Sequence, residues 1–220
     1  MQFDAGVLSP GLALACTVLA GILLLAALPG LGALRGHPER LHLLAGAAVA
    51  LASLWSVNAG VDPGISLHVL GIPAVVLLLG WRLGMLAAAL AAVALLLLGE
   101  TALDSAPVGW LVSAALPGAV ITAVAWAARF YLPRNPFVFI FVGAFFGAGL
   151  AVVATWLAGA ALLAMSGQPS PSGSGSSLIA FLPLVLFPEA FINGAVTSML
   201  VVYRPGWVRL YDERFYDRPR

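Results

Sequence analysis

The chain has 220 residues, of which 62% are hydrophobic and 9% charged, and its formal net charge at pH 7 is +1. A soluble domain keeps roughly a quarter of its residues charged, so this composition excludes a water-soluble globular protein. It predicts an all-α polytopic membrane helix bundle, surrounded by lipid and without a nucleic-acid partner. The single cysteine, Cys16, excludes an internal disulfide.

Seven stretches of the chain are predicted to be transmembrane helices, because a span needs roughly 20 mostly apolar residues. They cover residues 10–28, 41–57, 67–81, 83–99, 110–131, 136–165 and 178–203. The first begins at Ser9-Pro10, a cap residue followed by proline, which is a typical helix start. The third is short and contains Pro73, so the third and fourth stretches are either two spans or a re-entrant pair.

We expect a single transmembrane domain, residues 1–220, with two segments outside the helices. The composition of residues 166–177, SGQPSPSGSGSS, cannot bury apolar area and predicts a flexible external loop. Residues 204–220 mix arginines with aromatic residues, which predicts a cytoplasmic tail that anchors at the membrane interface or docks a partner. Residues 1–9 contain no basic residue, so we expect no cleaved secretory signal and keep residue 1 in the mature protein.

The distribution of arginine predicts the orientation of the chain. There is no lysine, and the ten basic residues are Arg35, Arg40, Arg82, Arg129, Arg134, Arg204, Arg209, Arg214, Arg218 and Arg220. In a bundle of about seven spans they all fall on one side, which the positive-inside rule makes cytoplasmic. The N-terminus is then outside and the C-terminus in the cytoplasm, in a multi-pass protein of the inner (cytoplasmic) membrane.

The opposite side carries acidic residues without a neighbouring base, namely Asp4, Asp62, Glu100 and Asp104. A negative outer mouth raises the local concentration of cations, although topology alone also leaves solvated acids there. His68 lies beside this mouth, in a stretch interrupted by glycine and proline. A neutral imidazole is a common ligand for nickel, cobalt or zinc; the alternative is a hydrogen-bonded structural histidine.

Glu189 lies near the middle of the last stretch, where a charge is costly. Asn193 and Thr197 follow at i+4 and i+8, so the three form a polar stripe that should face the bundle interior. Pro188 should kink the helix. The stripe is a proton or cation site, a hinge, or an interhelical hydrogen-bonded anchor.

Other motifs concern packing and catalysis. Gly143 and Gly147, in GAFFGAG, form a small-residue face suited to close helix packing. A P-loop requires lysine, so the chain is not itself a Walker-type ATPase. It contains no HExxH, CxxC or GxSxG motif, and an intramembrane enzyme built on Glu189 would lack a second catalytic group. We therefore expect no enzyme and no covalently bound cofactor.

The order of these features resembles the CbiM/NikM family, the substrate-binding membrane components of energy-coupling-factor cobalt and nickel transporters. The resemblance covers most of the chain and is carried by MQFDAGVLSP, GISLHVLGIPAVVLLLGWRLG, LLLLGETALDSAPVGWLVSAALPGAVI and FPEAFINGAVTSMLVVYRP. Within this family, the chain is similar to a divergent branch whose members are described as predicted membrane proteins or energy-coupling-factor permeases.

The resemblance implies that the N-terminus folds back into the bundle and that a metal ion is held by the Met1 amine, by residue 2 and by His68. In the family, residue 2 supplies a backbone nitrogen and an imidazole, whereas here it is Gln2. An amide side chain is a poor substitute for imidazole with nickel or cobalt. Asp4 or Asp62 then completes the site, or the substrate differs, or transport has been lost.

Two functions follow from this resemblance. The first is a membrane component of an energy-coupling-factor-type transporter, which binds nickel, cobalt or a small solute at its outer face. Uptake would be energised by a transmembrane coupling subunit and separate ATPase subunits, which agrees with the absence of lysine. The alternative is a non-transporting structural or assembly subunit of a larger membrane complex, for which the incomplete ligand set is the reason.

Overall fold

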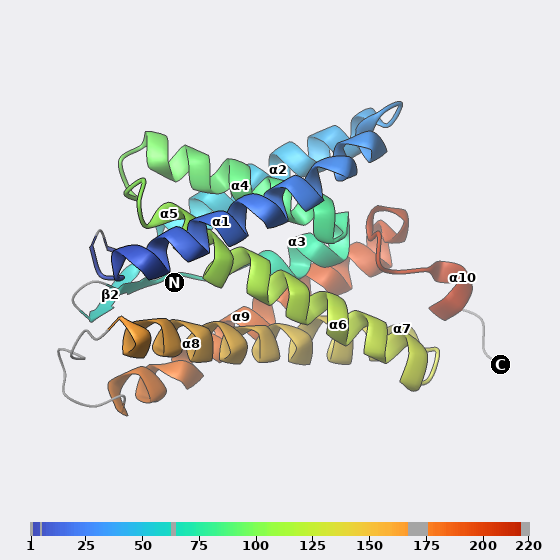
Figure 1. The fold of residues 1–220 in the computed structure, drawn as a ribbon. Helices are drawn as coiled ribbons and strands as arrows, with labels where there is room; N and C mark the ends of the chain where they lie inside the picture. Colours follow the sequence, from blue (N-terminus) through green and yellow to red (C-terminus); the bar gives the residue numbers. More distant parts are fainter. Residues whose placement is uncertain (1, 5, 63–64, 167–175, 217–220) are drawn as a thin grey trace.

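The computed structural model describes residues 2–4, 6–62, 65–166 and 176–216, and it is a helical bundle with a small sheet at one end (Figure 1). Its α-helices are α1 (Pro10–Ala27), α2 (Pro38–Ser56), α3 (Ile72–Leu79), α4 (Trp81–Leu97), α5 (Ala106–Trp110), α6 (Leu116–Tyr131), α7 (Pro136–Val138), α8 (Gly147–Met165), α9 (Ser176–Tyr203) and α10 (Glu213–Tyr216). The 3-10 helices are η1 (Leu28–Leu34) and η4 (Pro205–Trp207), and the π-helices are η2 (Leu111–Ala115) and η3 (Phe139–Phe146). The strands are β1 (Gln2–Phe3), β2 (Ala59–Asp62) and β3 (Ile65–Leu67). Most of the loop predicted at 166–177 lies outside the described residues.

The predicted helical membrane bundle is confirmed. Among the described residues, 4 helical stretches are long and apolar enough to cross a membrane: Pro10–Leu34, Ala106–Tyr131, Pro136–Met165 and Phe181–Tyr203. They correspond to the first, fifth, sixth and seventh predicted stretches, and Trp81–Leu97 is a shorter apolar helix.

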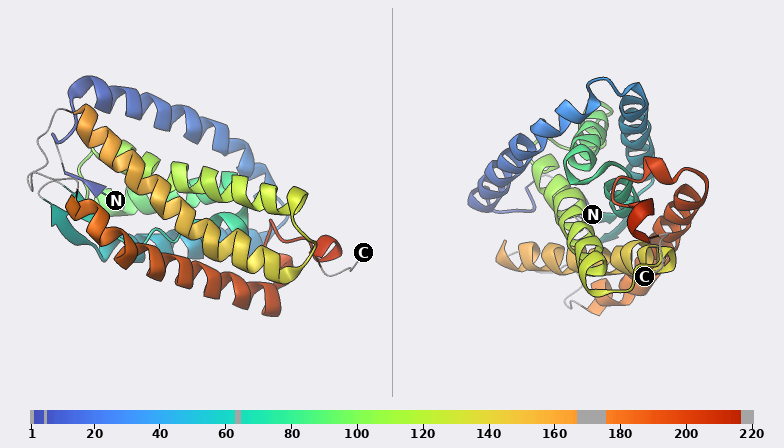
Figure 2. Two further views of the ribbon diagram at one scale, coloured as in Figure 1. Left: turned by 90° about the horizontal axis from the view of Figure 1, so that it is seen from below. Right: turned by 90° about the vertical axis from the view of Figure 1, so that its right-hand side faces the viewer.

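The outer surface of the bundle is apolar, as lipid contact requires. Leu14 and Leu25 on α1 are 66% and 67% exposed, and Leu157 on α8 is 68% exposed. Figure 2 shows α1 and α9 at the periphery, while α4 packs against α1, α2 and α3. The buried face of α4 includes Ala87 and Ala88, both 0% exposed, whose small side chains let neighbouring helices approach closely.

The third predicted stretch, 67–81, is helical over only part of its length. β3 ends at Leu67, and α3 begins at Ile72 and has 8 residues. At a rise of 1.5 Å per residue such a helix is about 12 Å long, well short of a bilayer core of about 30 Å. Gly71 and Gly80 bound α3 with φ of 66° and 79°, a left-handed conformation that glycine adopts without strain.

The three strands form an antiparallel sheet in the order β1-β3-β2, and β1 brings the start of the chain to it. Gln2 is opposite Ser66, and Phe3 is opposite Ile65. On the other side of β3, Gly60 is also opposite Ser66. The first residues of the chain therefore lie beside the strand that leads directly into His68.

At the other end of the bundle, the chain after α9 folds back against the helices, so that β2 and α10 lie at opposite ends (Figure 1). The backbone N–H of Arg209 donates to the carbonyl of Leu78, near the end of α3, at 3.0 Å. The ring of Tyr211 packs edge-on against Phe139, with 5.1 Å between ring centroids. The described part of the tail predicted at 204–220 is therefore packed on the bundle.

Candidate functional site

His68 follows β3 directly, is 5% exposed, and packs against Trp55 of α2 with 5.3 Å between ring centroids. Its Nδ1 lies 3.1 Å from the carbonyl oxygen of Val69, which can only accept, so Nδ1 carries the ring proton. This tautomer leaves the ring lone pair on Nε2. Donation from one ring nitrogen to a backbone carbonyl is typical of a histidine whose other nitrogen binds a metal ion.

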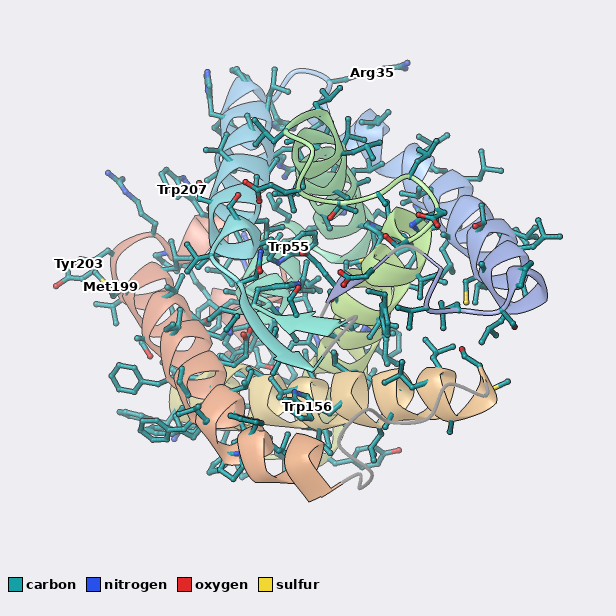
Figure 3. The ribbon with its side chains drawn as sticks, turned by 90° about the vertical axis from the view of Figure 1, so that its left-hand side faces the viewer. Arg35, Trp55, Trp156, Met199, Tyr203 and Trp207 are labelled. Carbon is teal, nitrogen blue, oxygen red and sulfur yellow. The ribbon has the colours of Figure 1, made fainter. Side chains whose placement is uncertain are left out.

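Trp55 fixes the segment that follows His68. The indole Nε1 of Trp55 donates to the carbonyl of Leu70 at 3.0 Å. Viewed onto the end that carries the sheet, Trp55 lies toward the centre of the bundle, next to the strands (Figure 3). The imidazole is thus held at the inner side of the sheet, away from lipid.

A small cavity lies beside this imidazole, and we call it the His68 cavity. Its free volume of ≈ 20 Å³ accommodates about one or two water-sized groups. β1, α2, α4 and the segment around α5 surround it, and its polar lining includes Gln2, His68, Thr101, Ser105, Trp110 and Ser113. The structure therefore brings together Gln2 and His68, two of the residues that the sequence singled out.

Sequence reasoning missed several residues of the cavity wall, among them Trp110 and Ser113. Trp110 ends α5, is 4% exposed, and its Nε1 has no hydrogen-bond partner among the described residues. Ser113 lies in the π-helix η2, just before Pro117 of α6. Proline cannot donate to the carbonyl four residues earlier and its ring needs room there, which a wider turn supplies. Pro117 was thus the sequence signal that could have predicted the π-helix on this side of the cavity. Trp110 had no such signal, because tryptophan is common wherever a membrane span meets the interface.

The other predicted ligands are Met1, Asp4 and Asp62, of which only the side chain of Asp4 is described. Asp4 is exposed and is not among the lining residues of the His68 cavity. Met1 and the side chain of Asp62 lie outside the described residues. No three histidine, cysteine, aspartate or glutamate side chains gather as a metal cluster among those that are described.

Glu189 and Asn193 on α9 hold the beginning of α3. The two carboxylate oxygens of Glu189 accept from the backbone N–H groups of Leu70, at 2.6 Å, and Gly71, at 2.8 Å. The side-chain oxygen of Asn193 accepts from the N–H of Ala74 at 2.8 Å, and its Nδ2 donates to Glu189 at 2.7 Å. The first N–H groups of a helix have no partner within the helix, so Asn193 caps α3 at Ala74, while Glu189 holds the two residues that precede Ile72. This geometry is that of an interhelical anchor.

Thr197, the third member of the stripe, is different. It is 1% exposed, and its hydroxyl has no hydrogen-bond partner in the described part of the chain. The helix itself continues through Pro188 from Ser176 to Tyr203. Only two of the three polar residues in the stripe therefore bind α3.

The two glycines singled out for packing also differ. A Cβ added at Gly147 would lie 2.7 Å from Cδ1 of Ile121, so α8 approaches α6 closely at this point. A Cβ at Gly143 would meet nothing nearer than Phe139 at 3.7 Å, which is an ordinary contact. The close helix approach depends on Gly147.

Comparison with known proteins agrees with this arrangement. Residues 3–207 match the family model CbiM, described as a cobalt uptake substrate-specific transmembrane region. The crystal structure of a transition metal transporter is similar with a TM-score of 0.76 and 18% identity, over 91% of this chain and 92% of that one. That of a truncated transition metal transporter has a TM-score of 0.70 and 16% identity, over 92% of this chain and 99% of that one. At these identities the likeness is one of fold, and a search of curated proteins finds no match.

Proposed function

The chain belongs to the CbiM family of cobalt uptake substrate-specific transmembrane regions, and from this premise we propose that it binds a divalent transition metal ion, nickel or cobalt, at its outer face. It is a membrane component of metal uptake. One observation carries the proposal: pairing of Gln2 with Ser66 in the sheet puts the start of the chain at the His68 cavity. An imidazole that lines a small cavity beside β1 suits a single cation.

The size of the cavity selects a metal ion over an organic solute. Pockets for drug-sized molecules measure roughly 300–1,000 Å³. The free volume of the His68 cavity is ≈ 20 Å³, which accommodates an ion and a ligand oxygen but no vitamin-sized molecule. Of the two substrate classes that the sequence left open, the cavity favours the cation.

Seven membrane passes with the N-terminus outside and the C-terminus in the cytoplasm form part of the proposal. Support comes from the gathering of arginine-bearing segments at the end opposite the sheet. The backbone of Arg209 is bonded to Leu78, and Arg129 lies 3.5 Å from the carboxylate of Asp212. By the positive-inside rule this end is cytoplasmic, and the His68 cavity then faces the outside.

Energy for uptake comes, in this proposal, from partners of the energy-coupling-factor type. The chain has no lysine for a P-loop, so ATP hydrolysis falls to separate ATPase subunits joined through a transmembrane coupling subunit. The inner membrane is the expected location. The alternative, a non-transporting assembly subunit, rests on Gln2, whose amide is a weaker ligand than imidazole for these metals.

Calorimetric titration of the purified full-length chain with nickel and cobalt tests the proposal. We expect saturable binding of one ion, and His68→Ala should weaken it by at least about 10- to 100-fold, since it removes a ligand rather than a residue behind one. His42→Ala is the matched control, because His42 is exposed on α2 and lies outside the cavity. Absence of binding of nickel, cobalt, copper and zinc to the wild-type chain would refute the proposal. Stoichiometric co-purification with non-transporter subunits, with metal uptake unchanged on deletion, would favour the assembly subunit.

A further inference from the structure

Trp110, on the wall of the His68 cavity, carries a buried hydrogen-bond donor that the described residues do not satisfy. Trp110 lines the cavity together with His68 and is 4% exposed. Its Nε1 has no acceptor among the described residues. The contrast with Trp55 is direct, because the indole of Trp55 lines the same cavity and donates to Leu70. Buried polar groups are nearly always paired, so an exception beside a cavity points to an acceptor supplied from outside the chain.

The chemistry of the indole limits what that acceptor is. An indole N–H donates and never accepts, and its hydrogen carries a partial positive charge. A bare metal cation is therefore repelled by this group, whereas an electron-rich oxygen, such as that of a water molecule, can accept its hydrogen bond. Among the described lining residues, no carboxylate reaches the cavity to supply it.

The cavity accommodates such an oxygen together with an ion. Its free volume of ≈ 20 Å³ corresponds to about one or two water-sized groups. Hydrated divalent cations commonly keep a water as one of their ligands when a protein supplies too few donors. Among the described residues that line this cavity, only His68 has a side-chain nitrogen that suits a metal ion, because Gln2 offers an amide.

We propose that Trp110 is a positioning residue that donates a hydrogen bond from Nε1 to a water molecule coordinated to the metal ion at His68. The inference rests on the proposed metal-binding function and deepens it, since the cavity then takes up the cation with one water still attached. Trp110 touches the ligand of the metal, not the metal itself.

The test uses Trp110→Phe, which keeps an aromatic ring and removes the N–H. We expect cobalt affinity to fall by about 10- to 100-fold, as for loss of other groups that orient metal ligands. The matched control is Trp126→Phe on α6, where the ring is 63% exposed and lies away from the cavity, and its cobalt affinity should equal that of the wild type. The visible absorption of bound cobalt, which reports its ligands, should change in Trp110→Phe alone.

A second measurement does not depend on the variant binding metal. In the wild-type chain labelled with ¹⁵N at its six tryptophans, the signal of the Trp110 indole N–H is assigned by its absence in Trp110→Phe. Adding zinc should move that signal downfield, because the N–H gains an acceptor. An unmoved signal with zinc bound, or equal cobalt affinity in both variants, overturns the role of Trp110 and leaves metal binding intact. Failure of the wild type to bind cobalt and zinc removes the proposed function itself.

Discussion

Replacing Glu189 by glutamine removes one of the two acceptors that hold the beginning of α3. The carboxylate accepts from Leu70 and Gly71, whereas glutamine keeps one oxygen and turns an NH₂ group toward the other backbone N–H. A buried donor left without an acceptor costs about 1–3 kcal/mol. We therefore expect Glu189→Gln to lower the free energy of unfolding by ~2 kcal/mol. Glu189→Ala loses both acceptors and should lower it by ~4 kcal/mol.

Thermal unfolding of the detergent-solubilised chain measures this difference. For a chain of this size, 1 kcal/mol corresponds to roughly 2–4 °C in Tm, so Glu189→Gln should melt about 4–8 °C below the wild type. Because Leu70 lies two residues after His68, nickel and cobalt affinity should fall as well.

Thr197→Val is the matched control on the same helix face. The Thr197 hydroxyl is buried without a partner among the described residues, so an apolar group of the same shape costs nothing and should leave Tm unchanged or higher. Equal Tm values for Glu189→Gln and the wild type would refute the reasoning that the carboxylate holds α3. A fall in Tm for Thr197→Val as large as that for Glu189→Gln would show that any change on this face has the same effect.

Two further predictions concern packing and the metal site. Gly147→Ala should lower the free energy of unfolding by about 1–3 kcal/mol, because the added methyl group meets Ile121. Gly143→Ala should change this free energy by less than about 0.5 kcal/mol. Thermal unfolding of both variants measures the difference. Gln2→His places a second imidazole at the His68 cavity and should raise nickel affinity by about 10-fold or more in calorimetric titration. Unchanged affinity in Gln2→His would argue that residue 2 does not reach the ion.

Hydropathy and helix-boundary signals predicted the long helices well. The sixth predicted stretch, 136–165, coincides with Pro136–Met165, and the first begins at Pro10 as expected. Proline at the first helical position explains both starts, since its missing N–H is one that a helix beginning leaves unpaired anyway. These signals are local, so they are present in the sequence itself.

The third stretch was not predictable in the same way. A short apolar run is compatible with either a strand or a buried helix. The stretch 67–81 contains the last residue of strand β3 and the whole of helix α3. Pairing of Gln2 with Ser66 joins residues far apart in the chain, so no periodicity indicates it. The resemblance to a known family, not the pattern of residues, led to the expectation that the N-terminus folds back.

Two buried polar groups, the Glu189 carboxylate and the Trp110 indole, differ in how their hydrogen bonds are completed, and this difference favours one of them as the neighbour of the proposed metal ion. The carboxylate of Glu189 is occupied by Leu70, Gly71 and Asn193, so it has a structural partner for each oxygen. If the Glu189 carboxylate bound an ion instead, the hydrogen bonds that hold the segment between His68 and α3 would be lost. Trp110 Nε1, in contrast, is a buried donor without an acceptor among the described residues, and Trp110 lines the same cavity as His68. A carboxylate with a partner for each oxygen is suited to holding structure, whereas a buried donor without a partner beside a cavity is available to a ligand. We therefore expect the proposed ion at His68 rather than at Glu189, whose hydrogen bonds to Leu70 and Gly71 hold the backbone just after His68.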